Sequence, residues 1–367
     1  MLKFALAAAI SLSLMFDPAV AEAKSKSKGR ATAVKRVKAK RAEPAKLIAR
    51  DNRKRMVRRV TMVKGKRKVV YQAVGRAAPA LALLTAGDMA GLNRTRDPLE
   101  LRSSVAYVMD QASSEVLFEK NATVALPIAS ITKLMTGLLV VQAHQDQDEV
   151  LTITEDDVDR HKYTSSRLPV GTRMTRGNLL HIALMSSENR AAAALGRNYP
   201  GGISAFVAAM NAKARELGMN DTRYVDSSGL SSQNVSSARD LARLVTIAHQ
   251  EPLLRQYTTD PNYVVQAGNR SLQYSNTNYL VALPDWNIGL QKTGFINEAG
   301  RCLVMQAMIQ GRNVVMVFLD SKGKQSRTAD AGRMRRWLEA LKPAAIPATA
   351  AAGVPVTVSA AAGPAVH

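Results

Sequence analysis

A serine followed three residues later by a lysine is the spacing in this chain that most directly suggests chemistry; it occurs in Ser130-Ile131-Thr132-Lys133. The residues from Ser130 to about His144 favour a helix, and positions three apart lie on one helix face, so the amine can reach the hydroxyl. A serine hydroxyl becomes nucleophilic when a neighbouring base takes its proton, and a lysine can do this if burial or a second cation lowers its pKa. A helix N-terminus adds backbone N–H groups that favour an oxyanion. The pattern predicts acyl transfer through Ser130 with Lys133 as base.

Two other short strings follow at a distance, Ser187-Glu188-Asn189 and Lys292-Thr293-Gly294. Each string alone arises by chance, since Ser130 or Ser187 could merely cap a helix and the third string could be a polar strand end. In this order, however, the three strings resemble the motif set of the penicillin-binding proteins and serine β-lactamases. Lys292 would then supply the second cation near Lys133 if the fold brings the two together.

The resemblance extends from about Asp97 to Leu341 and is strongest to the D-alanyl-D-alanine endopeptidase branch of the low-molecular-mass penicillin-binding proteins. Besides the three strings, it is carried by Leu126-Pro127-Ile128-Ala129, Leu184-Met185-Ser186, Tyr199-Pro200-Gly201-Gly202 and Trp286-Asn287-Ile288. It implies an α/β, β-lactamase/transpeptidase-like fold. In such a fold a mainly antiparallel sheet of about five strands is covered by helices, and the active site lies between the sheet and a helical subdomain.

The resemblance also implies a role for each motif residue. Ser187 would relay a proton to the leaving amine, and the backbone N–H groups of Ser130 and Phe295 would form the oxyanion hole. Substrate binding, including that of the carboxylate of the D-configured leaving residue, would fall to Asn189, Lys292, Thr293 and Gly294. One position departs from many relatives: Ile296 stands where they carry a threonine, so a side-chain hydrogen bond to substrate is lost there.

The elements expected from periodicity agree with this architecture. Strands are expected at residues 105–109, 116–118, 303–309 and 314–319, with one more strand carrying Lys292. Helices are expected at residues 174–185, 188–198, 203–217, 238–249 and 326–341. A sheet built from both chain ends with a helical insertion between them is a mixed layered architecture.

Composition divides the chain into four parts. We expect a signal peptide at residues 1–21, a basic and largely disordered arm at 22–95, a penicillin-binding catalytic domain at 96–342 and a flexible Ala/Pro-rich tail at 343–367. The signal peptide is indicated by Lys3, the apolar run from Phe4 to Phe16, and the small-x-small site Ala19-Val20-Ala21. This leader predicts export to the periplasm.

The net charge of +22 belongs mainly to the arm, because Lys24 to Arg76 contains 21 basic residues and two acidic ones. Nucleic-acid binding is disfavoured, since only Tyr71 could stack on a base and export removes the protein from nucleic acid. Two interpretations remain: a tether to anionic wall polymer or lipid head groups, or a solvated spacer without a partner. Residues 57–71 could form a hairpin within the arm.

Other chemistries are disfavoured by residue type. A single cysteine, Cys302, cannot form an intramolecular disulfide, and its apolar surroundings predict a buried, inert thiol. The five histidines do not show metal-ligand spacing, so no metal and no cofactor are expected.

The sequence therefore favours a serine DD-endopeptidase that hydrolyses D-alanyl–diaminopimelate crosslinks of peptidoglycan through an acyl-enzyme and is inhibited covalently by β-lactams. One alternative is a DD-carboxypeptidase that removes terminal D-alanine, and another is a non-catalytic wall-binding protein. A β-lactamase is disfavoured, because no carboxylate between Ser187 and Lys292 stands in a recognisable motif for deacylation.

Overall fold

The computed structural model describes residues 56–63, 66–73, 84–268 and 270–341. The chain divides into two compact units, Met1–Ala78 and Pro79–His367, each of which is described by itself. In the first unit, strands β1 (Met56–Val63) and β2 (Lys66–Ala73) pair antiparallel, which confirms the hairpin expected in the arm. The expected signal peptide, the remainder of the arm to residue 83 and the C-terminal tail lie outside the described residues.

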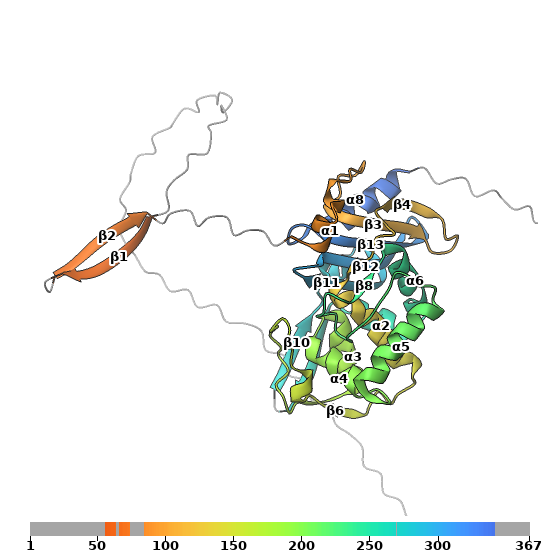
Figure 1. Cartoon of the computed structure of the whole chain (residues 1–367), viewed down its shortest axis with the longest axis horizontal. Coiled ribbons are helices and arrows are strands. Elements are labelled where there is room, and N and C mark those ends of the chain that lie inside the picture. The colour runs from red at the N-terminus through yellow and green to blue at the C-terminus, as the bar shows by residue number, and fades with distance from the viewer. Residues whose placement is uncertain (1–55, 64–65, 74–83, 269, 342–367) are drawn as a thin grey trace, which may run out of the picture. The chain divides into compact units, whose positions relative to one another are not determined.

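The second unit contains the predicted five-stranded sheet (Figure 1). Its strands, in sheet order, are β11 (Asn287–Ile296), β12 (Gly300–Ile309), β13 (Arg312–Ser321), β3 (Ser103–Asp110) and β4 (Val116–Lys120). All four pairings are antiparallel. Strands from both ends of this unit's sequence therefore meet in one sheet, as expected, and the string Lys292-Thr293-Gly294 lies on its edge strand β11.

Alternating side chains cover the two faces of this sheet. In β13, Val315 and Val317 belong to a core shared with helix α6 (Ala238–Ala248), whereas Met316 and Phe318 belong to a core shared with helix α8 (Ser326–Ala340). Successive strand residues point to opposite faces, so these runs are almost entirely apolar. The sheet is consequently buried on both sides.

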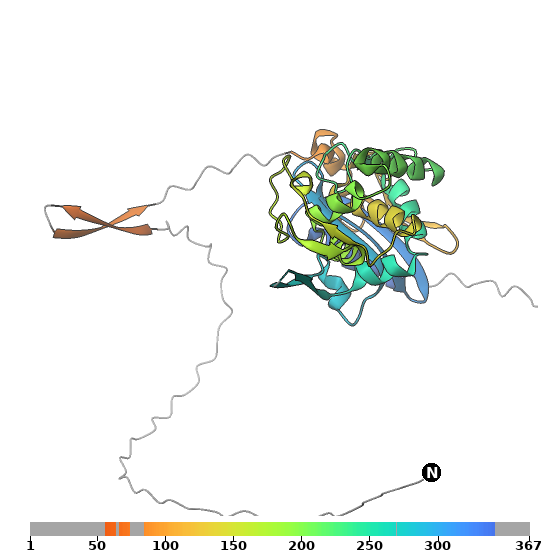
Figure 2. The same cartoon turned by 90° about the horizontal axis from the view of Figure 1, so that it is seen from below.

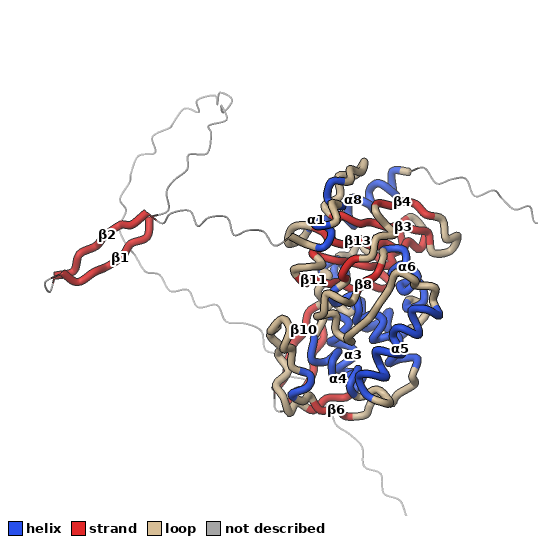
Figure 3. Tube along the Cα trace, in the orientation of Figure 1, coloured by secondary structure: helices blue, strands red, loops and turns tan. Residues whose placement is uncertain are grey.

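Helices fill the other half of this unit (Figure 3). They are α2 (Thr132–Gln142), α3 (Arg176–Met185), α4 (Asn189–Arg197), α5 (Gly202–Glu216) and α7 (Pro252–Thr259). Polar side chains begin several of them: Thr175 accepts the Asn178 amide at α3, and Ser237 accepts the Asp240 amide at α6. The predicted helices over 174–185, 188–198, 203–217, 238–249 and 326–341 are confirmed within a few residues.

Several smaller elements were not expected. Three two-stranded sheets pair β5 (Leu126–Pro127) with β8 (Val235–Ser236), β6 (Val150–Thr152) with β7 (Arg173–Thr175), and β9 (Asn262–Ala267) with β10 (Arg270–Ser275). The short helices are α1 (Ala86–Met89), η1 (Leu92–Arg94), η2 (Ala129–Ile131), η3 (Glu155–Asp157) and η4 (Tyr279–Ala282). The β9–β10 hairpin lies at the rim of the unit in both views (Figures 1 and 2).

The folded part of the catalytic unit starts before residue 96, where the arm was expected to end. The Ala86 amide donates to the Glu298 carbonyl at 2.9 Å, and Asp88 pairs with Lys322. These contacts dock α1 on the sheet, although its short sequence carries little periodic signal.

Within the described ranges, no helix combines the length and apolarity required to cross a bilayer.

Candidate active site

Ser130 lies in the short helix η2, and Lys133 lies in the first turn of helix α2, which follows η2 directly. Lys133 Nζ donates hydrogen bonds to Ser130 Oγ at 2.8 Å, to Asn189 Oδ1 at 2.8 Å and to the Ser228 carbonyl at 2.5 Å. Lys133 is completely buried, and Ser130 is partly exposed. The structure therefore joins residues from the first two sequence strings at one amine.

A second buried amine lies in the same site. Lys292 Nζ, on β11, donates to Ser187 Oγ at 2.6 Å and to the Thr293 carbonyl at 3.0 Å. Ser187 lies between α3 and α4 with φ +66°, an uncommon conformation for a non-glycine residue that is often found at functional sites. The Thr293 hydroxyl contacts the Thr277 hydroxyl at 2.6 Å. The third string thus contacts the second directly.

The two amines influence each other's protonation. Complete burial lowers the pKa of Lys133 to about 8, although the carboxylates of Asp226 and Glu188 oppose this shift. Burial, together with the positive charges of Lys133 and Arg327, holds the pKa of Lys292 well below its usual value. Neutral lysine is a base, so the arrangement provides a proton acceptor beside Ser130 near neutral pH.

The backbone of β11 approaches the Ser130 amide closely. A Cβ added at Gly294 would lie 3.2 Å from the Ser130 nitrogen and 2.8 Å from the Ile128 carbonyl oxygen. Glycine is therefore needed for strand and helix start to meet. The Arg327 guanidinium, on helix α8, donates to the Gly294 carbonyl at 2.8 Å and so holds this part of the strand in place. Phe295, the residue expected to complete the oxyanion hole, follows Gly294 directly in β11.

A loop segment, residues 159–168, lies against the second string. Its Thr164 hydroxyl accepts from Asn189 Nδ2 at 3.0 Å, and its Ser166 hydroxyl donates to Glu188 at 2.7 Å. Lys162 pairs with Glu298, in the turn after β11. Glu188 also caps α4 by accepting the Arg190 amide. The segment thus contacts both the second string and the turn after β11.

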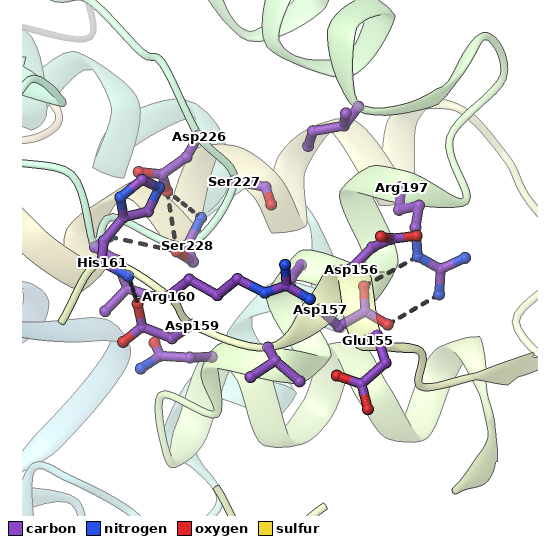
Figure 4. A pocket seen from close by; sticks show the side chains of 15 residues that line it. Glu155, Asp156, Asp157, Asp159, Arg160, His161, Arg197, Asp226, Ser227 and Ser228 are labelled. Carbon is purple, nitrogen blue, oxygen red and sulfur yellow. Dashed lines mark hydrogen bonds and ion pairs between the residues drawn. The ribbon is translucent and has the colours of Figure 1, made fainter. Parts of the chain in front are cut away.

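Two cavities share Asn189 in their walls. One, of about 350 Å³, is lined by Ser187, Glu188 and the loop residues Ser165 to Arg167. The other, of about 400 Å³, lies between residues 155–161 and 226–230, and Figure 4 shows its charged lining. Asn189, which contacts Lys133, therefore borders both cavities. In the described part of the chain, no group of three metal-ligating side chains comes together.

Several site residues carried no recognisable signal in the sequence. These are Thr164, Asp226, Ser228, Asn234 and Arg327. None of them stands at a motif spacing. The Ser228 group that accepts a hydrogen bond from Lys133 is a backbone carbonyl, which every residue type has, so the sequence cannot indicate it. Ile296 is buried in β11, which is compatible with the absence of a polar side chain there.

Gly229 is expected to be intolerant of any side chain. Its φ is +80°, and an added Cβ would lie 1.9 Å from the carbonyl oxygen of Ala129, the residue before Ser130. Gly229→Ala should lower the free energy of unfolding by about 3 kcal/mol, from backbone strain plus overpacking. Gly311→Ala is the matched control, since Gly311 has φ +78° and open space around it, and should cost only about 1 kcal/mol. Urea denaturation measures both; equal losses would show that the contact with Ala129 does not constrain the turn.

Comparisons with known proteins agree with this geometry. The fold is that of penicillin-binding DD-peptidases: the structure of penicillin-binding protein D2 from Listeria monocytogenes in the cefotaxime-bound form is similar with a TM-score of 0.59 and 29% identity, over 66% of this chain and 98% of that one. The family model described as D-alanyl-D-alanine carboxypeptidase matches residues 92–323. The chain belongs to this D-alanyl-D-alanine carboxypeptidase family.

Curated relatives are similar over most of their own length. A D-alanyl-D-alanine endopeptidase of Pseudomonas aeruginosa is 51% identical over 255 residues, which are 69% of this chain and 82% of the relative. A D-alanyl-D-alanine endopeptidase of Escherichia coli is 44% identical over 253 residues, 68% of this chain and 82% of the relative. The predicted fold class and family are confirmed.

Proposed function

We propose that this protein is a serine DD-endopeptidase that hydrolyses D-alanyl–diaminopimelate crosslinks of peptidoglycan through an acyl-enzyme on Ser130. The single observation that carries the proposal is the Lys133 amine, which contacts Ser130 Oγ and Asn189 Oδ1 at 2.8 Å each while buried and of lowered pKa. The relatives described above support the choice of bond, since both are named endopeptidases.

Each of the motif residues is assigned a step in acylation. Ser130 Oγ attacks the D-alanyl carbonyl, and Lys133 accepts the hydroxyl proton. The backbone N–H groups of Ser130 and Phe295 stabilise the oxyanion. Ser187 relays a proton to the departing amine, so that the proton taken by Lys133 is returned to the leaving group. Water then hydrolyses the ester.

Substrate binding is assigned to the groups around this centre. Asn189 holds the substrate amide after exchanging its contact with Thr164. Lys292 and Thr293 bind the carboxylate of the leaving residue, because a bound anion restores the charge that burial disfavours on the lysine. Gly294 leaves space for the substrate backbone along β11.

A DD-carboxypeptidase is the second candidate, and the name of the family model favours it. Both reactions begin with attack on the same D-alanyl carbonyl and differ only in the leaving group. For either activity we propose export to the periplasm, covalent inhibition by β-lactams and an adduct that turns over slowly. The arm would add electrostatic attraction to anionic wall polymer or lipid head groups.

Purified crosslinked muropeptides distinguish the two activities. The full-length protein should convert dimers to monomers, as followed by chromatography and mass spectrometry, with protein pre-incubated with penicillin as the inactive control. Release of free D-alanine from pentapeptides without loss of dimers would instead establish the carboxypeptidase. Absence of both products would contradict the proposed function.

The pH dependence of acylation should report the lysine base. With a pKa of about 8 for Lys133, the amine is protonated and inactive at lower pH. The second-order rate of acylation by a penicillin should therefore rise through a midpoint near pH 8. Stopped-flow fluorescence between pH 6 and 10 measures this limb; a flat profile across that range would exclude Lys133 as the base.

A further inference from the structure

The turn at residues 226–231 is held by hydrogen bonds to its carbonyl groups, two of which accept from side chains of helix α2. Three successive carbonyls each accept one side-chain donor: Asp226 O from Asn234 Nδ2 at 3.1 Å, Ser227 O from Thr136 Oγ1 at 2.7 Å, and Ser228 O from Lys133 Nζ at 2.5 Å. Thr136 stands one helical turn after Lys133, on the same face of α2. The position of this turn therefore determines where the amine of Lys133 is held.

One carboxylate builds the turn. Asp226 Oδ1 accepts from the Ser228 amide at 2.7 Å, the Ser228 hydroxyl at 3.0 Å and the Gly229 amide at 2.5 Å, and Oδ2 accepts from the Ser231 amide at 2.9 Å. Figure 4 shows this carboxylate directed at Ser228. Hydrogen bonds to a charged acceptor are stronger than neutral ones, and only a carboxylate offers two oxygens for four donors.

The same turn also contacts the residue before the nucleophile. Gly229 packs directly on the Ala129 carbonyl, as its steric environment shows. Asn234, which is fully buried, joins the backbone of Val225 to the Thr132 hydroxyl at the start of α2. Movement of the turn would consequently displace the base and the backbone of the nucleophile together.

We propose that Asp226 is a positioning residue for acylation: its carboxylate holds the 226–231 turn so that the Ser228 carbonyl keeps Lys133 Nζ against Ser130 Oγ. This inference rests on the role proposed above for Lys133 as the base. Asp226 acts through Ser228 and does not touch the reacting atoms.

The negative charge of Asp226 allows a second measurement, the pH dependence of acylation. The charged groups that face Lys133 are Asp226 in the turn, Glu188 before α4 and Lys292 on β11. Both carboxylates raise the pKa of Lys133 against the effect of burial. Removing the charge of Asp226 should therefore lower that pKa and move the acid limb of the rate profile to lower pH, a shift that loss of stability alone would not produce.

The test uses the full-length protein and compares Asp226→Asn with a matched control. Asp240→Asn is the control, because Asp240 also holds a turn, accepting the Asp221 amide at 2.8 Å and the Thr222 hydroxyl at 2.9 Å, but does not contact residues 226–231 through these bonds. Acylation by a fluorescent penicillin is measured from pH 6 to 10, per active site titrated. Asp226→Asn should be slower by on the order of 10- to 100-fold with its acid limb at lower pH, since small misplacements of a catalytic group cost this much. Asp240→Asn should match the wild type in rate and limb.

A second variant covers the case in which Asp226→Asn does not fold. Ser228→Ala removes one hydrogen-bond donor to the Asp226 carboxylate and keeps the Ser228 carbonyl. It should slow acylation, as Asp226→Asn does, but by only about 3-fold. Wild-type acylation with an unmoved limb in Asp226→Asn would overturn the inference, and so would a wild-type acylation rate in Ser228→Ala if that is the folded variant. Slower deacylation with normal acylation would also overturn it, because Asp226 would then be a base for hydrolysis. Failure of the wild type to acylate at all would contradict the proposed function instead.

Discussion

Replacing Lys133 with methionine is expected to slow acylation of Ser130 by about 10³-fold or more. Methionine keeps most of the length of the side chain but has no amine to accept the Ser130 proton, and general-base groups contribute roughly 10²- to 10⁴-fold. The substitution also leaves Asn189 Oδ1 and the Ser228 carbonyl without this donor. Methionine also removes the cost of burying the charged amine, which offsets the loss of these hydrogen bonds, so the protein should remain folded.

The measurement is the second-order rate of acylation by a fluorescent penicillin, with the fold checked by thermal denaturation. Lys213→Met, on helix α5, is the control and should acylate like the wild type, since Lys213 pairs with Glu216 on the same helix. A Lys133→Met rate within 10-fold of the wild type would show that another group takes the serine proton.

Replacing Lys292 with methionine should abolish the preference for substrates with a free terminal carboxylate. Lys292 Nζ is buried between Ser187 and the Thr293 carbonyl, where a substrate carboxylate would form a charge-assisted hydrogen bond. Loss of that bond and of the Ser187 contact should lower kcat/KM for a D-alanyl-D-alanine peptide by about 10²-fold. Arg327, behind the strand, limits the loss by retaining one positive charge in the region.

A pair of peptides makes this test specific. The wild type should hydrolyse the free acid much faster than the C-terminal amide, and the ratio should approach unity in Lys292→Met, whose rate on the amide changes less than its rate on the acid. A preserved ratio in the variant would place carboxylate recognition elsewhere in the cleft.

The fold was largely predictable because its strands are strongly patterned. Residues 303–309 and 314–319 form apolar runs separated by Gly311, and they pair as β12 and β13. The β9–β10 hairpin was missed because only Val265 and Tyr274 in it are buried, which leaves little hydrophobic pattern to detect.

The site was predictable only where residues close in the sequence are also in contact in the structure. Ser130 and Lys133 lie one helical turn apart, so their contact follows from local geometry. The contact between Lys133 and the Ser228 carbonyl joins positions 95 residues apart, and Asp226 acts on it through backbone amides. No residue spacing reports such a contact, because tertiary packing alone brings the turn to α2.

The most direct test of this account is the position of the covalent adduct formed with a labelled penicillin. Proteolysis and mass spectrometry of the full-length protein should place the label on Ser130, and Ser130→Ala should remain unlabelled. A label on Ser187, or no stable label on a folded protein, would contradict the assignment of Ser130 as the nucleophile.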